Sequence, residues 1–208
     1  MNCQYCGNNA IFNCSVCRRP VCNIHAQQRV TCAACIKKRR VDYVIGKAIA
    51  ENDADWIRKF VSEFWGEERQ LTFDRELDPV DYTAYIGRVG NSAIAFISLV
   101  EDKDDLIIVA LGVYPEYQRS GIGTSLVEKA ELQARRSGKK RMLVSTSNDN
   151  LPALGFYQAL GFQIFEVAPN ALERKHGEII EGIGGLPVRD ELRLQKTLAS
   201  LHVEMLGT

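Results

Sequence analysis

The feature that most constrains this chain is the placement of its cysteines. All seven lie between Cys3 and Cys35, and none follows. With one histidine they form four close pairs, each with two residues between its members: Cys3 and Cys6, Cys14 and Cys17, Cys22 and His25, and Cys32 and Cys35. Eight such ligands suit two tetrahedral zinc ions, because one pair wraps around an ion and a second pair completes its coordination. A segment this short cannot fold by apolar burial alone, so we expect metal binding to supply much of its folding free energy.

The same cysteines also indicate a cellular compartment. An odd number of cysteines in close pairs fits metal ligation in a reducing compartment better than a disulfide framework, so we expect a cytoplasmic protein. The spacing leaves an iron–sulfur cluster or unmetallated thiols as alternatives to zinc. The longest apolar runs, 92–100 and 106–113, are far shorter than the roughly 20 residues of a membrane helix, and the first residues lack the pattern of a signal peptide. No membrane partner is expected.

The pattern of ligand pairs resembles B-box and related cross-brace zinc fingers. In that family the first and third pairs bind one ion, and the second and fourth pairs bind the other. The resemblance implies one site made by Cys3, Cys6, Cys22 and His25, and another made by Cys14, Cys17, Cys32 and Cys35. A sequential arrangement uses the same eight residues, so the spacing alone leaves the connectivity open.

Basic residues accompany these cysteines. Residues 1–40 contain seven Lys or Arg and no Asp or Glu, whereas the rest of the chain contains 19 basic and 26 acidic residues. This clustering is typical of nucleic-acid binding. Seven thiolates and two zinc ions would lower the charge of the segment by three, to about plus four, and the basic run at 37–40 also suits a solvated linker. We therefore favour a protein partner over nucleic acid, and a purely stabilising role stays open.

Residues 39–208 are expected to form one α/β (mixed α+β) domain after a zinc-binding module at 1–38. Apolar alternation and turn residues predict an antiparallel meander of three strands, and helical periodicity begins after Pro115. A polar side chain at 51–53 is expected to cap the first helix, which Gly66 ends. Residues 168–188 carry no clear pattern. The expected elements are strands at 43–48, 82–89, 92–100, 106–113, 142–147, 162–167 and 191–198, and helices at about 51–65, 122–137 and 150–160. They make a mixed sheet with helices on its faces.

Two glycines lie where an apolar strand runs into an amphipathic helix. Gly121 and Gly123 follow the run 106–113 and stand at the start of the pattern Ile122, Leu126, Ala130. Glycine permits backbone conformations and close approaches that side chains forbid, and the free N–H groups at a helix start bind anions. The turn therefore predicts a cradle for a pyrophosphate group.

This turn and a second motif resemble the GNAT acetyltransferase superfamily. Residues 118–123, Gln-Arg-Ser-Gly-Ile-Gly, match its Gln/Arg-x-x-Gly-x-Gly/Ala signature, and Asn150, Ala153, Tyr157 and Gly161-Phe162 match its second signature. The resemblance extends over about residues 43–198. It implies the GNAT fold, in which the fourth and fifth strands of a mixed sheet separate to admit acetyl-CoA.

The resemblance also implies residue roles. The Asn150 side chain would bond to the coenzyme, and Tyr157 would be the general acid that protonates the departing thiolate. A phenol with a pKa of about 10 suits that task, although an ordinary half-buried aromatic is the alternative for Tyr157. The backbone of Leu111 and Val113 would pair with the pantetheine arm. The pyrophosphate would lie at the turn made by Gln118, Arg119, Gly121, Ile122, Gly123 and Thr124.

The general base of the family has no counterpart here. Many members carry a glutamate on the fourth strand, where this chain has Ile107, which cannot accept a proton. Six side chains are candidates to replace it, directly or through water, and each can equally be an ordinary surface group: Glu63, Glu67, Glu68, Glu101, His176 and Asp190.

Three functions follow from these observations. The first is acetyl transfer from acetyl-CoA to a primary amine by direct attack on the thioester. The second is a binding or regulatory protein, in which the GNAT fold senses coenzyme A or is inactive and the zinc module docks to protein or nucleic acid. The third, nucleic-acid binding with catalysis secondary, depends only on the basic N-terminal segment. Asn150 and Tyr157 favour the enzyme, and no motif identifies the amine.

Overall fold

A computed structural model describes residues 41–198 continuously and, before them, only residues 2, 9–10, 12–13, 19–21, 26–27 and 31–32. Before residue 41 there are short antiparallel ladders. β1 (Phe12–Asn13) pairs with β2 (Pro20–Val21), and β3 (Ala26–Gln27) pairs with β4 (Thr31–Cys32).

The predicted meander is confirmed in β8 (Thr83–Val89), β9 (Ser92–Asp102) and β10 (Asp105–Val113), which pair antiparallel in chain order. The β9–β10 turn is shorter than predicted, because the strands extend to Asp102 and resume at Asp105. Lys103 adopts a left-handed φ of 48° and so allows a two-residue turn.

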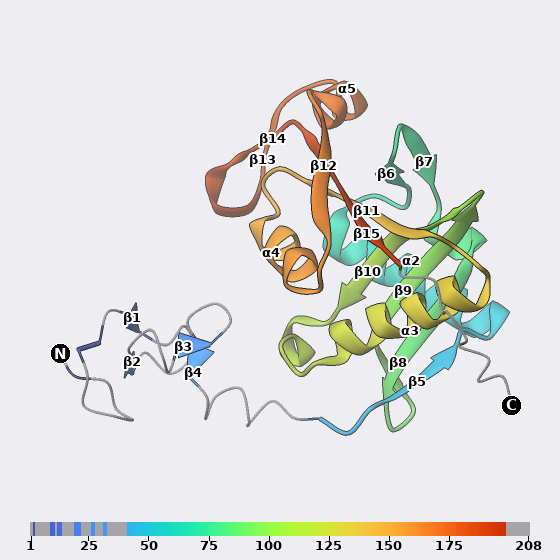
Figure 1. Cartoon of the computed structure of the whole chain (residues 1–208), viewed down its shortest axis with the longest axis horizontal. Helices are drawn as coiled ribbons and strands as arrows, with labels where there is room; N and C mark the ends of the chain where they lie inside the picture. The colour runs from blue at the N-terminus through green and yellow to red at the C-terminus, as the bar shows by residue number, and fades with distance from the viewer. Residues whose placement is uncertain are drawn as a thin grey trace, which may run out of the picture.

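The meander belongs to a seven-stranded sheet with the order β12-β15-β11-β10-β9-β8-β5. Its pairs are antiparallel except β10 with β11, which run parallel. The remaining strands of the sheet are β5 (Val44–Lys47), β11 (Arg141–Ser147), β12 (Gln163–Ala168) and β15 (Glu191–Thr197). The mixed sheet with helices on its faces, expected from the sequence, is confirmed (Figure 1).

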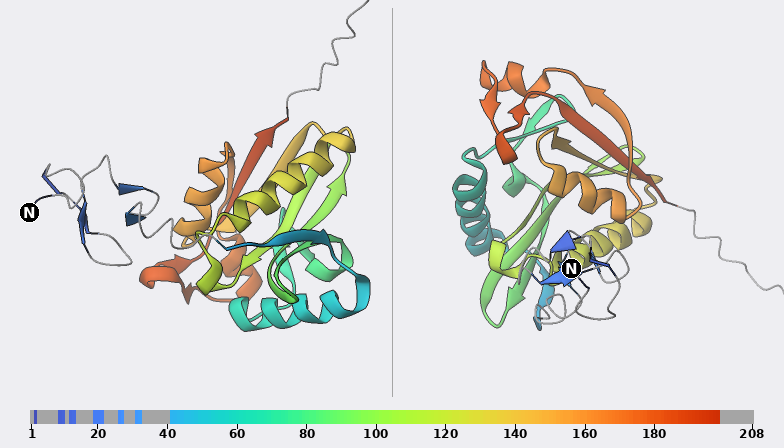
Figure 2. Two further views of the ribbon diagram at one scale, coloured as in Figure 1. Left: turned by 90° about the horizontal axis from the view of Figure 1, so that it is seen from below. Right: turned by 90° about the vertical axis from the view of Figure 1, so that its left-hand side faces the viewer.

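Helices cover both faces of this sheet (Figure 2). On one face α2 (Ala50–Trp65) buries Ile57, Phe60 and Val61 against Ile86 and Phe96. On the other face α3 (Ile122–Arg136) and α4 (Leu151–Ala159) pack on a larger apolar cluster. The described helices include none that is long and apolar enough to cross a membrane.

The start of α2 differs from the prediction of a cap at 51–53. The N-cap is Ile49, which offers no side-chain bond, and Asp53 instead reaches back one turn to accept from the Ile49 N–H at 2.7 Å. The other oxygen of Asp53 is ion-paired with Arg88 on β8, so the same carboxylate also ties the helix to the sheet. The predicted stop is confirmed, because Gly66 takes the left-handed C-cap conformation with φ 71°.

Two segments without a clear sequence pattern form small elements beside the sheet. The first is a hairpin of β6 (Gln70–Thr72) and β7 (Arg75–Leu77), followed by the 3-10 turn η1 (Pro79–Asp81). The second segment, between β12 and β15, contains four short elements: α5 (Ala171–His176), β13 (Ile180–Glu181), η3 (Ile183–Gly185) and β14 (Pro187–Val188).

Candidate active site

The sheet opens between its two parallel strands. β10 and β11 pair over four positions, from Asp105 with Arg141 to Ile108 with Val144, and then separate. At the same point the pairing of β10 with β9 shifts at Val109, a bulge that re-aims the rest of β10. From there β10 continues to Val113 and β11 to Ser147 without a ladder between them. The backbone of Leu111 and Val113 therefore has β9 on one side and no paired strand of the described residues on the other.

The glycine turn stands at the end of β10 and opens α3. The short 3-10 turn η2 (Pro115–Tyr117) precedes it, and both Arg119 and Gly121 adopt left-handed backbone angles, φ 65° and φ 96°. A side chain at position 121 would be strained, which explains glycine at the N-cap. The first helical bond is donated by Ser125 to the carbonyl of Gly121. Within residues 41–198 no group accepts a bond from the amides of Gly121, Ile122, Gly123 or Thr124.

Neighbouring side chains shape this turn. Gly123 lies against Phe156 of α4 and Val113 of β10, where a Cβ atom would meet their carbons at 3.4 and 3.7 Å. The Gln118 side-chain amide donates to the Val113 carbonyl at 3.1 Å. On the opposite side of the turn Tyr43, whose hydroxyl bonds to Ser125 Oγ at 2.9 Å, lies beside Gly121. The turn is thus held between β10, α4 and the residues before β5.

Ser120 is a residue that the sequence motif did not single out. Its Oγ is buried and has no hydrogen-bond partner in the described part of the chain. A buried hydroxyl without a partner is unfavourable unless a ligand supplies one. It lies in the same turn as the free amides, so it adds a side-chain donor to them. Its place between Arg119 and Gly121 was the available signal, but that position of the motif accepts any residue.

Asn150 begins α4 at the mouth of the opening. Its Oδ1 accepts from the backbone N–H of Ala153 at 3.1 Å, so the side chain is the helix N-cap. The predicted bond to a coenzyme must therefore come from the remaining amide group, Nδ2, which no described residue engages.

Tyr157 lies about two turns after Asn150 along α4 and is 5% exposed. Its ring makes edge contacts with Phe156 and Phe162, with centroids at 5.2 and 5.5 Å. Burial raises the pKa of the phenol well above its usual value, so the hydroxyl stays protonated at neutral pH. The described residues offer that hydroxyl no hydrogen bond.

The predicted general bases come from different elements of the fold. Ile107 is 3% exposed in the parallel ladder, which confirms an apolar side chain at the position of the family glutamate. Glu101 pairs with Leu106 at the opposite end of β10 from the turn, and the bond from Lys139 lowers its pKa. The bonds from Arg189 and from the Asn170 N–H likewise lower the pKa of Asp190.

The other candidates either form an ion pair or have no polar partner among the described residues. Glu67 forms an ion pair with Lys175 at 2.6 Å. Glu63, Glu68 and His176 form no hydrogen bond or ion pair with described residues. The structure therefore adds no support for any one of the six as the base.

A buried carboxylate that sequence reasoning missed lies at the mouth of the opening. Asp149, between β11 and the N-cap of α4, is 5% exposed. Its Oδ2 accepts from the Ile183 N–H at 2.9 Å, and its Oδ1 is buried without a partner in the described chain. Asn148 beside it binds the backbone of Pro187, Arg189 and Asp190. These two side chains fasten the segment before β15 against the carboxyl end of β11.

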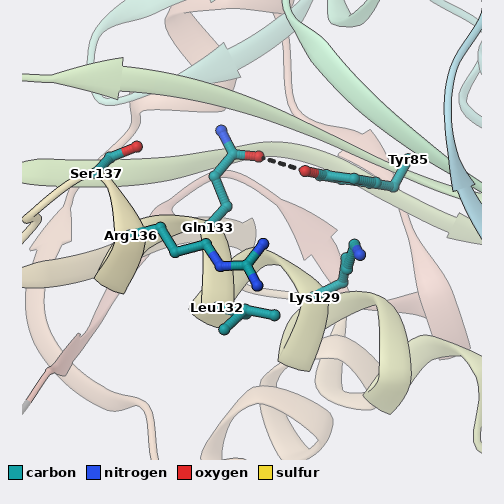
Figure 3. A pocket seen from close by; sticks show the side chains of 6 residues that line it. All are labelled: Tyr85, Lys129, Leu132, Gln133, Arg136 and Ser137. Atoms are coloured by element: carbon teal, nitrogen blue, oxygen red, sulfur yellow. Dashed lines mark hydrogen bonds between the residues drawn. The ribbon is translucent and has the colours of Figure 1, made fainter.

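A shallow hollow elsewhere on the domain is unrelated to this opening (Figure 3). It lies between β8 and the second half of α3, and the Tyr85 hydroxyl donates across it to Gln133 at 2.9 Å. Its volume of about 110 Å³ is small for an organic cofactor. The residues that line it are Tyr85, Lys129, Leu132, Gln133, Arg136 and Ser137.

The predicted zinc ligands fall outside the residues that the structure describes. Cys3, Cys6, Cys14, Cys17, Cys22, His25 and Cys35 are not described, and for Cys32 only the backbone is, at the end of β4. Among the described residues no three His, Cys, Asp or Glu side chains gather to bind a metal. The zinc site stays a prediction.

Comparisons with known proteins agree with this geometry. The model of the acetyltransferase (GNAT) family matches residues 51–162, more than half of the chain. The protein YxbD of Bacillus subtilis is 32% identical over 150 residues, which are 69% of this chain and 92% of that relative. The structure of an IAA acetyltransferase from Bacillus cereus superposes with a TM-score of 0.64 at 26% identity, and that of a Bacillus subtilis acetyltransferase in complex with CoA with 0.59 at 22%.

Both superpositions cover 76% of this chain and all of the other chain. Residues 41–198 make up the same share of this chain, so the covered part corresponds in size to these residues. The order of the strands, the opening between β10 and β11, the glycine turn and these matches lead to one conclusion. The chain belongs to the GNAT family of acetyltransferases.

Proposed function

We propose that this acetyltransferase, which acts on acetyl-CoA, transfers the acetyl group to a primary amine by direct attack on the thioester. The observation that carries the proposal is the opening between β10 and β11, bordered by four backbone amides without acceptors. Such amides at the positive end of a 15-residue helix bind a pyrophosphate through charge-assisted hydrogen bonds.

The residues around the opening suit the rest of the coenzyme. The free backbone edge at Leu111 and Val113 offers peptide groups to the amides of a pantetheine arm, in the manner of an added strand. The Val113 carbonyl already accepts from the Gln118 side-chain amide and has a second lone pair for the coenzyme. Asn150 Nδ2 and the Ser120 hydroxyl supply two further polar contacts.

The chemical step needs one proton moved to sulfur. The amine nitrogen attacks the thioester carbon, the C–S bond breaks, and the coenzyme A thiolate takes a proton from Tyr157. Its raised pKa keeps the phenol protonated before the transfer, and its ring contacts with Phe156 and Phe162 hold it in place. The amine loses its own proton to solvent, and proton return to Tyr157 completes the cycle.

The N-terminal residues 1–38 form, in this proposal, a module held by two Zn²⁺ that serves for interaction or stabilisation. The ladders of β1 with β2 and of β3 with β4 support it, because short antiparallel strands commonly flank paired zinc ligands. Cys14 and Cys17 lie between β1 and β2, and Cys22 and His25 between β2 and β3. Residues 39–208 then form the acetyltransferase domain.

Calorimetry with coenzyme A and acetyl-CoA tests the coenzyme site. Gly121→Leu is expected to abolish or strongly weaken binding, since a side chain obstructs the turn. Gly138→Leu is the matched control, because Gly138 also has a positive φ of 68° but lies at the other end of α3, about 22 Å away for a 15-residue helix. Wild-type protein that binds neither coenzyme at millimolar concentration would refute the site. A turnover screen against amino acids, polyamines, aminoglycosides and peptides then tests the amine.

A further inference from the structure

Tyr43 joins two distant parts of the chain at the start of the domain. It lies one residue before β5 and is half-buried at the margin of the core cluster beneath α3 and α4. Its hydroxyl forms a hydrogen bond of 2.9 Å with Ser125 Oγ, in the first turn of α3. The chain that enters the domain is therefore fastened to the helix that begins at the glycine turn.

The Tyr43 hydroxyl lies beside the free amides of that turn. A Cβ atom at Gly121 would stand 3.7 Å from the hydroxyl oxygen, and apart from the chain neighbours of Gly121 no other described residue comes within 4 Å of that position. Gly121 is the N-cap of α3, and its carbonyl accepts from the Ser125 N–H. The phenol thus borders a space at the positive end of the helix that no other described side chain fills.

This hydroxyl has a donor to offer to an anion. A phenol carries one O–H and can also accept, and in the bond between Tyr43 and Ser125 either oxygen can be the donor. Tyr43 forms no other hydrogen bond with a described residue. When Ser125 donates, the Tyr43 O–H is free to turn toward the amides, and the bond that it accepts makes it a stronger donor.

A pyrophosphate offers more acceptor positions than the amides of residues 121–124 can fill. Those amides point along the helix axis and meet the group from one direction, whereas Tyr43 reaches the turn from another element. We propose that Tyr43 is a coenzyme-binding residue whose hydroxyl donates to the pyrophosphate. The inference rests on the coenzyme site proposed above and adds to it a side chain from outside both signature motifs. It makes the entry of the chain into the domain a part of the coenzyme site.

Calorimetry of the full chain with coenzyme A tests the contact. Tyr43→Phe keeps the ring and should raise the dissociation constant roughly 10-fold to 100-fold, as for a lost hydrogen bond to a charged group. Ser125→Ala breaks the same hydrogen bond but leaves the phenol, so it should change the affinity far less. Tyr85→Phe is the matched control and should leave the affinity unchanged, because Tyr85 also bonds to α3 at 2.9 Å, but at Gln133, far from the turn.

Equal losses in Tyr43→Phe and Ser125→Ala would mean that the hydroxyl only supports the fold, and would overturn the proposal, as would an unchanged affinity in Tyr43→Phe. Wild-type protein that does not bind coenzyme A would refute the coenzyme site itself and this contact with it.

Hydrogen exchange of the wild type needs no substitution and keeps the test decisive if a variant folds poorly. Coenzyme A should slow exchange at residues 42–45 but not at residues 102–105, the turn at the opposite end of β10. Binding of coenzyme A without slower exchange at 42–45 would also overturn the role of Tyr43.

Discussion

At the scale of single residues, the Ser120 hydroxyl is unfavourable for folding and is proposed to contact the coenzyme. Its Oγ is buried without a partner in the described chain and lies in the turn that is proposed to hold the pyrophosphate. Ser120→Ala is expected to weaken coenzyme A binding about 10-fold or more, as for a lost bond to a charged group, while the free protein becomes slightly more stable. Calorimetry and urea unfolding measure the two effects. Equal coenzyme affinity in both proteins would show that the hydroxyl does not contact the ligand.

Tyr157 is the residue on which the proposed chemistry most depends. Tyr157→Phe keeps the ring contacts with Phe156 and Phe162 and removes no hydrogen bond to a described residue, so stability and coenzyme affinity should barely change. Loss of the general acid should lower turnover by roughly 100-fold to 10,000-fold with any amine found by the screen.

The pH profile gives a second readout of Tyr157. Because burial raises the pKa of the phenol, its protonated form persists, and turnover should show no loss attributable to Tyr157 up to about pH 10. Wild-type turnover in the Phe variant, under conditions where chemistry limits the rate, would remove Tyr157 from the mechanism.

At the scale of elements, Glu131 joins α3 to β15. Its two oxygens bind Arg135 on the same helix at 2.7 Å and Lys196 on the strand at 2.6 Å. Burial pushes its pKa up, but the bonds from Lys196 and Arg135 together outweigh burial, and the pKa lies below its usual value. The carboxylate therefore stabilises the fold above the unfolded pKa of about 4.3, and this contribution is lost as the pH falls through the folded value.

Glu131→Gln should accordingly lower the free energy of unfolding by roughly 1 kcal/mol at pH 7, and the difference from wild type should shrink below about pH 4.5. Urea titrations followed by tryptophan fluorescence suit the measurement, because both tryptophans, Trp56 and Trp65, lie in α2 of the same domain. Glu128→Gln, an exposed glutamate of α3 without an ion pair to a described residue, is the control. A pH-independent difference would mean that Glu131 acts through packing instead.

The elements also show what the sequence could predict. The meander and α3 were predictable because their apolar residues follow the strand and helix periods, and both signature motifs lie at the ends of such elements. The β6–β7 hairpin was not, since its turn residues Phe73 and Asp74 take positive φ of 50° and 62° without a glycine. Contacts distant in sequence support that turn: the Phe73 N–H donates to Glu191 at 2.9 Å, and the Arg193 guanidinium lies over the Phe73 ring at 5.3 Å.

The candidate site, like the fold, could be predicted only in part. Backbone donors follow from glycine positions, so the turn at 118–124 could be found from a single sequence. The unpartnered atoms of Ser120 and Asp149 could not, because their isolation depends on which groups the fold brings near them. The same holds for the bond of Asn150 to its own helix, which a motif match does not reveal.

At the scale of the whole molecule, the chain offers separate reporters for its two predicted domains. All seven cysteines precede residue 36, and both tryptophans follow residue 55. Thiol reactivity therefore reports only on the N-terminal module, and tryptophan fluorescence only on the acetyltransferase domain. This division allows the zinc proposal and the independence of the two domains to be tested in one experiment on the full chain.

Protein purified without chelator is expected to contain two zinc ions per chain and to react slowly with a thiol reagent. A strong chelator should make all seven thiols reactive, because the module has no sufficient apolar core to keep it folded without metal. The tryptophan emission and the urea midpoint of the acetyltransferase domain should stay unchanged, as expected of domains with separate cores. A metal ratio near zero, or iron with labile sulfide, would refute zinc. Loss of the tryptophan signal together with thiol exposure would instead mean that the metal-binding segment is integral to the acetyltransferase fold.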